Sequence, residues 1–189
     1  MSDQEKDRSV IDTQQVGETT DEKTGEKIIE VEPVPTTSSG KRLYNLDLNP
    51  PEALVIHCAD PRFQNAFREF ITGELGIRNY APVIIGGGVH AFGAQSFLPK
   101  NFKILWEQVK FFVKEARVRQ IIIINHEDCK WYEKLKGFHP TIDLPIKGKL
   151  DLGRAARVIL DDFAGVNVRM FWASLEGNQV SFSELTTAD

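Results

Sequence analysis

The chain has 189 residues, of which 41% are hydrophobic, and a formal net charge of −4 at pH 7. This size and composition suit one domain with a substantial core. No apolar run approaches the ~18 residues of a membrane-spanning helix, and the amino-terminal residues lack the apolar stretch of a targeting signal. We therefore expect neither a membrane protein nor an exported one.

The first 40 residues differ from the rest of the chain. They carry ten acidic and four basic residues, a net charge of −6, and no aromatic residue. Such a segment cannot bury enough apolar surface to offset its loss of conformational entropy, so we expect residues 1–40 to be mostly a disordered acidic segment. Within it, KIIEVEPV is a candidate edge strand or an arm on a partner subunit. Subtracting −6 from −4 leaves +2 for residues 41–189, and a near-neutral domain without a basic face gives no reason to expect a nucleic-acid partner.

The first predicted strand of the folded domain is ALVIHC, Ala53 to Cys58. After it, Asp60 suits a helix N-cap and Pro61 suits the first helical position. Apolar residues at helical spacing then predict a helix from about residue 61 to residue 74. A short strand is expected near Gly76–Asn79, before a glycine-rich loop.

The second half of the domain repeats this alternation. Residues 100–117 form the clearest amphipathic helix, and a second is expected over residues 150–163. Between them, QIIIIN is a continuous apolar run, typical of a parallel strand that is covered on both faces. The last segment, NVRMFWASLEGNQVSFSEL, alternates in polarity and turns at Glu176–Asn178, which predicts a hairpin. The sequence therefore predicts an α/β fold, with a mainly parallel β-sheet flanked by helices and a C-terminal antiparallel strand or hairpin.

Three potential metal ligands follow the predicted strands. Cys58 and His126 each lie at the carboxyl end of a strand, where ligands collect in such sheets, and Cys129 follows His126 by three residues. Thiolate and imidazole are the groups that zinc prefers, and a catalytic zinc site uses three protein ligands. Each residue alone is more simply explained as part of the core or of a loop. Because all three occupy the expected strand ends, we expect one Zn²⁺ per chain.

Asp60 and Arg62 follow the first cysteine directly. Asp-Pro is a common helix start, so a cap is the simple explanation of Asp60. The functional alternative is that the carboxylate accepts a hydrogen bond from zinc-bound hydroxide. Arg62 would then pair with Asp60, keep it ionised and fix its orientation.

The combination of CxDxR, Cys58 to Arg62, with HxxC, His126 to Cys129, resembles the β-class carbonic anhydrase family. The similarity extends over about residues 50–185 and includes GELGIRN and the lead into the second motif. The resemblance implies that residues 41–189 form a zinc domain that reversibly hydrates carbon dioxide to bicarbonate through a zinc-bound hydroxide. Cys58, His126 and Cys129 would be the ligands, and Asp60 with Arg62 the catalytic pair. It also implies a homodimer or a multiple of dimers.

The chain departs from the family pattern beside the second motif. Asn125 and Lys130 replace residues that are usually glycine, Trp131 follows, and Tyr80 stands where small residues are usual. Two alternatives therefore stay open. One is a related zinc hydrolase of a carbon dioxide analogue, carbonyl sulfide or carbon disulfide, and the other is a non-catalytic zinc-binding protein. A ring of Trp131 or Tyr80 over the metal would favour the second.

The number of cysteines indicates the redox setting of the protein. The three consecutive glycines and the other histidines are expected to have no part in phosphate binding or catalysis. Two cysteines 71 positions apart are not a disulfide framework, so we expect a reducing, cytoplasmic setting. Residues 86–88, three glycines, are interpreted as a flexible loop rather than a phosphate cradle. His57 should point to the opposite face from Cys58, and His90 and His139 are expected to be non-catalytic.

Overall fold

The computed structural model describes residues 17–20, 27–30, 46–93 and 99–186. Backbone contacts divide the chain into two units, Met1–Asn45 and Leu46–Asp189. In the first unit, strands β1 (Gly17–Thr20) and β2 (Lys27–Glu30) pair in antiparallel fashion. The other residues of the segment expected to be disordered lie outside the described residues, so that expectation stays a prediction.

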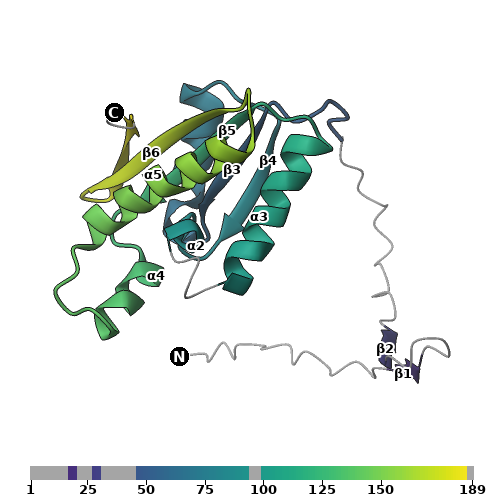
Figure 1. Ribbon diagram of the computed structural model, residues 1–189, viewed down its shortest axis with the longest axis horizontal. Coiled ribbons are helices and arrows are strands. Elements are labelled where there is room, and N and C mark those ends of the chain that lie inside the picture. The colour runs from purple at the N-terminus through teal and green to yellow at the C-terminus, as the bar shows by residue number, and fades with distance from the viewer. Residues whose placement is uncertain (1–16, 21–26, 31–45, 94–98, 187–189) are drawn as a thin grey trace, which may run out of the picture. The chain divides into compact units, whose positions relative to one another are not determined.

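The second unit is built on a five-stranded sheet in the order β4-β3-β5-β6-β7 (Figure 1). Its strands are β3 (Ala53–Cys58), β4 (Tyr80–Ile85), β5 (Gln120–His126), β6 (Asn167–Glu176) and β7 (Gln179–Leu185). β4, β3, β5 and β6 are parallel, and β7 forms an antiparallel hairpin with β6. The predicted fold class is therefore confirmed.

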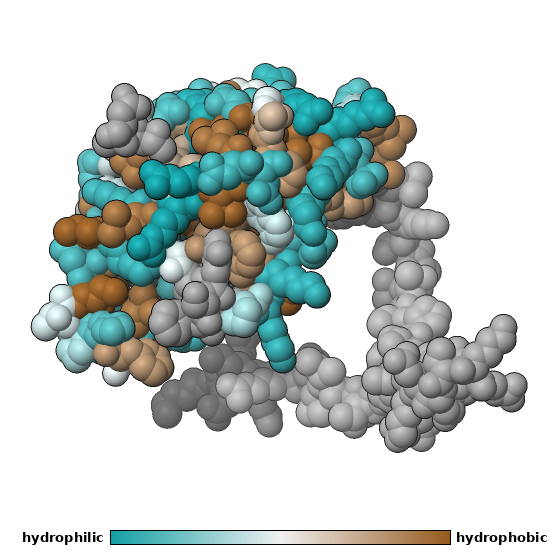
Figure 2. Space-filling view, in the orientation of Figure 1, coloured by the Kyte–Doolittle hydropathy of each residue, from teal (hydrophilic) through white to brown (hydrophobic). Residues whose placement is uncertain are grey.

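Helices cover both faces of this sheet. They are a helical segment from Pro61 to Glu74 whose central turn is α1 (Gln64–Glu69), then α2 (His90–Gly93), α3 (Pro99–Lys114), α4 (Lys130–Glu133) with a 3-10 turn (Lys134–Gly137), and α5 (Leu144–Asp162). α3 and α5 lie on one face (Figure 1), and the α1 segment packs on the other. Polar residues gather on the outer side of α3 (Figure 2), and two hydrophobic residues of this helix, Ile104 and Phe111, are also exposed. In the part of the chain described here, no helix is long and apolar enough to cross a membrane.

The central strand β5 shows why the sheet is covered twice. Ile121 and Ile123 pack with residues of α3 and α5, whereas Ile122 and Ile124 pack with the α1 segment. All four are fully buried. Burial of one such side chain contributes about 1.5–3 kcal/mol, so this run stabilises β5 at the centre of the sheet. Its parallel pairing with β3 and β6 confirms the predicted parallel strand.

The strand predicted near Gly76–Asn79 is wrong, because the strand in this region is β4, Tyr80–Ile85. Gly76, with φ +70°, instead turns the chain out of the preceding helix. The backbone N–H groups of residues 78 and 79 then donate to Oε1 of Glu52, at 3.1 and 2.9 Å. Pro82 argues against a central strand in sequence terms, but β4 is an edge strand, where a missing N–H is tolerated.

The helix predicted over residues 150–163 begins six residues earlier, at Leu144, and ends at Asp162. The Oδ1 atom of Asp143 caps it by accepting a hydrogen bond from the backbone N of Ile146 at 2.9 Å. Pro145 occupies the first turn, where a proline costs no hydrogen bond. This additional turn and a half places the start of α5 beside residues 126–129.

Candidate metal centre

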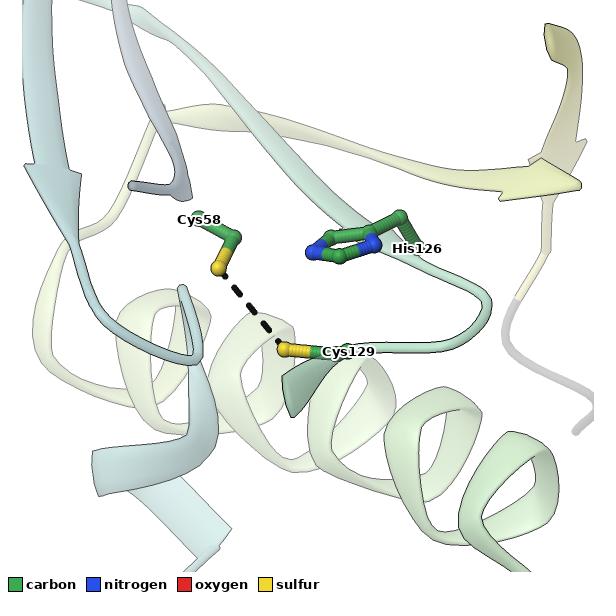
Figure 3. A group of neighbouring side chains, drawn as sticks. All are labelled: Cys58, His126 and Cys129. Atoms are coloured by element: carbon green, nitrogen blue, oxygen red, sulfur yellow. Dashed lines mark hydrogen bonds between the residues drawn. The ribbon is translucent and has the colours of Figure 1, made fainter. Parts of the chain in front are cut away.

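Cys58 is the last residue of β3, and β3 lies between β4 and β5 in the sheet. The side chain is 3% exposed. Its Sγ atom accepts a hydrogen bond from the backbone N–H of Gly87 at 3.3 Å and lies 3.7 Å from Sγ of Cys129 (Figure 3). His57 packs its ring on Phe67 in the opposite layer, with 4.7 Å between ring centroids, as its place in the strand predicted.

His126 ends β5 and is oriented by the turn that follows it. Its Nδ1 lies 2.7 Å from the carbonyl oxygen of Glu127, an acceptor, so Nδ1 carries the proton and donates it. Glu127 is fixed to β6, because its backbone N–H donates to Ala173 O at 2.9 Å and its Oε2 accepts from the backbone of Leu175 at 3.0 Å. The turn continues through Asp128, with φ +53°, and returns the chain toward the sheet.

Three donor atoms, from Cys58, His126 and Cys129, lie within 4.8 Å of one another, and all three residues are buried (Figure 3). Nε2 of His126 is a buried atom without a hydrogen-bond partner among the described residues. With Nδ1 protonated, Nε2 has a free lone pair, which a metal ion would use. Two thiol sulfurs and one such nitrogen fit the ligand preferences of zinc.

The two thiol groups change each other's pKa through their hydrogen bond. The hydrogen bond from Cys129 lowers the pKa of Cys58 to about 4, although burial acts in the opposite direction. The same hydrogen bond, together with burial, raises the pKa of Cys129. One thiolate is therefore favoured before any metal binds, and metal binding would release the proton that remains.

Asp60 and Arg62 form the ion pair that the sequence suggested. Nη2 of Arg62 donates to Oδ2 of Asp60 at 2.7 Å, and Nε donates to Oδ1 at 3.0 Å. Asp60 also caps the following helix, because Oδ1 accepts from the backbone N of Arg62 at 3.0 Å. The arginine hydrogen bonds lower the pKa of Asp60 from its usual value. The carboxylate is thus held by Arg62 in its ionised form, with its side chain 8% exposed.

The glycine-rich loop contacts the site through its backbone. Gly87 has φ +79° and donates its N–H to Cys58, so it requires a conformation that other residues rarely adopt. The indole ring of Trp131 packs on Gly86 and Gly87, where a Cβ atom would overlap it. The segment, interpreted from the sequence as a flexible loop, is a tight turn packed against Trp131 and Cys58.

The structure places three of the residues that depart from the family pattern. Tyr80 pairs with Ala53 at the opposite end of the strands from Cys58, so its ring does not cover the ligands. Lys130 is exposed and forms ion pairs with Asp128 at 3.1 Å and with Glu133 at 3.0 Å. Trp131 is different, because it packs against the cluster that contains both cysteines.

A small cavity of about 10 Å³ lies against His126 and Cys129, with Tyr132 and Trp172 among its other walls. A volume of this size holds about one water molecule.

Sequence reasoning missed a group of polar residues that includes the neighbours of His126 and Cys129 in the chain. They are His90, Asn125, Tyr132, Lys147 and Asp151, joined by hydrogen bonds within a buried region. The available signal was the pair of polar residues, Asn125 and Asp151, at positions where the apolar pattern calls for core residues. His139, by contrast, is exposed, as expected.

Comparison with solved structures identifies the fold. The β-carbonic anhydrase CafA of the fungal pathogen Aspergillus fumigatus is 15% identical with a TM-score of 0.50, and the match covers 74% of this chain and 77% of that one. One of two tetrameric β-carbonic anhydrases of Sordaria macrospora is 15% identical, with a TM-score of 0.47 over 72% and 81% of the two chains. An apo form of carbon disulfide hydrolase is also 15% identical, with a TM-score of 0.39 over 70% and 78%. No family model and no curated protein sequence matches the chain.

Proposed function

We propose that this chain, whose fold is that of the β-class carbonic anhydrases, is a zinc enzyme of that family that reversibly hydrates carbon dioxide to bicarbonate and a proton. The observation that carries the proposal is the convergence of the donor atoms of Cys58, His126 and Cys129 within 4.8 Å, with a buried histidine nitrogen that has no hydrogen-bond partner among the described residues. The ionised pair of Asp60 and Arg62 directly follows the first of these ligands in the chain.

Cys58, His126 and Cys129 would hold the metal. Two thiolates and a neutral imidazole balance the charge of Zn²⁺, so the complex would be neutral. When bound, zinc would lower the pKa of a water molecule to about 7 and so supply a nucleophile at neutral pH.

Asp60 would orient the reacting water by accepting a hydrogen bond from it. For this role the carboxylate must be ionised and held in place, and Arg62 provides both through its hydrogen bonds to the two carboxylate oxygens. The arginine is itself fixed by Asp128, to which Nη1 donates at 2.8 Å. Asp60 and Arg62 are therefore the proposed catalytic residues.

The decisive experiment combines metal analysis with stopped-flow hydration of carbon dioxide by the same purified sample. We expect about one zinc per chain and a hydration rate that disappears on chelation and returns with Zn²⁺. The proposal is overturned if fully zinc-loaded protein shows no hydration. In that case, release of hydrogen sulfide from carbonyl sulfide or carbon disulfide identifies a hydrolase, and inactivity toward all three identifies a non-catalytic zinc protein.

Assembly and location are further proposals. We propose a homodimer or a multiple of dimers, in keeping with the tetrameric enzymes of Sordaria macrospora, and light scattering after size-exclusion chromatography tests this. A cytoplasmic setting remains a prediction from the two free thiols.

A further inference from the structure

Asp151, on α5, is a carboxylate with no exposed surface. Its Oδ2 accepts a hydrogen bond from the hydroxyl of Tyr132 at 3.0 Å and lies 3.3 Å from Nδ1 of His90. Lys147, one turn earlier on α5, forms an ion pair with both carboxylate oxygens. A Cβ atom at Gly93 would overlap this carboxylate, so α2 packs closely on it.

Burying such a carboxylate is costly unless it is paired and fully hydrogen-bonded. A well-packed apolar side chain would join the same helices at no such cost. The hydrogen-bond partners of Asp151 lie on α2, α4 and α5. Among them, Tyr132 is the residue that lies close in the chain to a proposed metal ligand, Cys129. This connection suggests a function for the buried carboxylate.

Tyr132 connects Asp151 to the segments that carry two of the ligands. While its hydroxyl donates to Asp151, its oxygen accepts a hydrogen bond from Nδ2 of Asn125 at 3.0 Å. Asn125 directly precedes His126, and Tyr132 lies one helical turn after Cys129 in α4. The hydrogen bond between these two side chains therefore closes the loop that presents both ligands.

The direction of each hydrogen bond depends on Asp151. A phenol has one proton to donate, and Asn125 contributes an amide N–H to the contact, so the Tyr132 oxygen must act as acceptor there. Asp151 only accepts, which commits the phenol proton to it and leaves the oxygen free for Asn125. Nδ2 of Asn125 also donates to Gly148 O at 3.0 Å, so both of its N–H groups are used.

We propose that Asp151 is a positioning residue for the metal: it orients the hydroxyl of Tyr132, which through Asn125 fixes the separation of His126 and Cys129. This inference rests on the metal site of the proposed function. It differs from a purely structural role, in which Asp151 would only join three helices and the ligand geometry would be independent of it.

The test measures Zn²⁺ affinity by competition with a chelator, together with the melting temperature of the metal-free protein. Tyr132→Phe removes one hydroxyl and keeps the ring. We expect it to lower zinc affinity about 10–100-fold, the usual effect of losing a partner outside the ligand shell, and to change the thiolate-to-metal absorption of the Co²⁺ form. Asp151→Ala should have a similar effect, and Asp151→Asn, which keeps an acceptor for the hydroxyl, a smaller one.

A double variant makes the test sharper. If Asp151 acts through Tyr132, Tyr132→Phe with Asp151→Ala should bind zinc about as weakly as Tyr132→Phe alone, because the two changes interrupt the same connection. The matched control is Ile159→Val, a fully buried position about 12 Å further along α5. It should lower the melting temperature of the metal-free protein without changing zinc affinity.

The proposal is overturned if Tyr132→Phe and Asp151→Ala bind zinc with wild-type affinity, whatever their melting temperatures, because the cluster is then only part of the core. It is also overturned if the two affinity losses multiply in the double variant. Failure of the proposed function gives a different result. A wild-type chain that binds zinc but hydrates no carbon dioxide leaves this inference intact, whereas a wild-type chain without zinc affinity overturns both.

Discussion

Arg62 and Asp128 are joined by two hydrogen bonds although 66 positions separate them: Nη1 donates to Oδ2 at 2.8 Å and Nη2 to the backbone oxygen at 2.9 Å. The other donors of the same guanidinium bind Asp60. One arginine therefore links the loop after β3 to the turn after β5, the two segments next to the proposed metal ligands. The rigid planar fork of arginine suits this role, which lysine could not fill.

We expect Asp128→Ala to weaken activity but retain zinc. The change removes one side-chain hydrogen bond to Arg62 and the exposed ion pair with Lys130, while the hydrogen bonds from Arg62 to Asp60 remain. Loss of such an outer partner typically costs about 10–100-fold in activity. The initial rate of carbon dioxide hydration at equal zinc content measures the effect, and an unchanged rate would show that Asp60 alone suffices to hold Arg62.

Asp60→Asn should keep zinc and lose most activity, by about 10²–10⁴-fold if the carboxylate assists proton movement. Asparagine caps a helix about as well as aspartate, so the cap at the start of the 61–74 helix is preserved. Parallel assays of metal content, melting temperature and hydration rate separate the two roles. Full activity with zinc bound would reduce Asp60 to a helix cap.

Gly87→Ala should destabilise the fold by about 1–3 kcal/mol and weaken zinc binding. A methyl group would overlap Trp131, and the φ of +79° is unfavourable for alanine. Relief of this strain would move the N–H that donates to Cys58. Gly153→Ala is the control, because it lies in α5 with open space around it, and there alanine should stabilise by about 0.5–1 kcal/mol. Urea unfolding of both metal-free variants measures the difference.

Arg169 and Glu184 give a prediction of pH dependence. Their bidentate ion pair across β6 and β7, at 2.8 Å for each contact, lowers the pKa of Glu184 below its usual 4.5. A carboxylate with a lowered folded-state pKa stabilises the fold above its unfolded pKa and loses that contribution as pH falls through the folded value.

Glu184→Gln should therefore reduce the free energy of unfolding near pH 7 by about 0.2–1 kcal/mol, the range for partly exposed pairs. The difference from wild type should shrink as the pH falls below 4.5. Urea titrations of both proteins across this range provide the test, and a difference that grows toward acid pH would contradict the sign.

Removal of residues 1–40 should leave the fold and its cooperative melt intact. The residues of the two large core clusters all lie between Ala53 and Leu185. Thermal unfolding of the shortened chain, followed by circular dichroism, is the measurement. Aggregation or a broadened transition would show that the acidic segment is a structural arm.

The errors of sequence reasoning have physical causes. The strand β4 contains Pro82, which an edge position tolerates, and only the strand order reveals that β4 is an edge. Pro145 and Gly148 are uncommon inside helices, so the helical pattern is weak in the first turns of α5. The cap by Asp143 forms because the preceding loop places this residue at the start of the helix. Both errors concern element boundaries, which are decided by neighbours that a local pattern does not contain.

From the sequence alone came the mainly parallel α/β architecture, the two-sided burial of β5, and the positions of Cys58 and His126 at the carboxyl ends of adjacent strands, with Cys129 three residues further on. These features follow from local periodicity and from the rule that the carboxyl ends of parallel strands share an edge. Only the tertiary structure decided that Arg62 also binds Asp128, and that Asp151 reaches the ligand segments through Tyr132. Both contacts join residues that lie far apart in the chain. They form only when the surrounding loops and helices pack on the sheet, and that packing is decided by the burial of many side chains together, not by any short stretch of sequence.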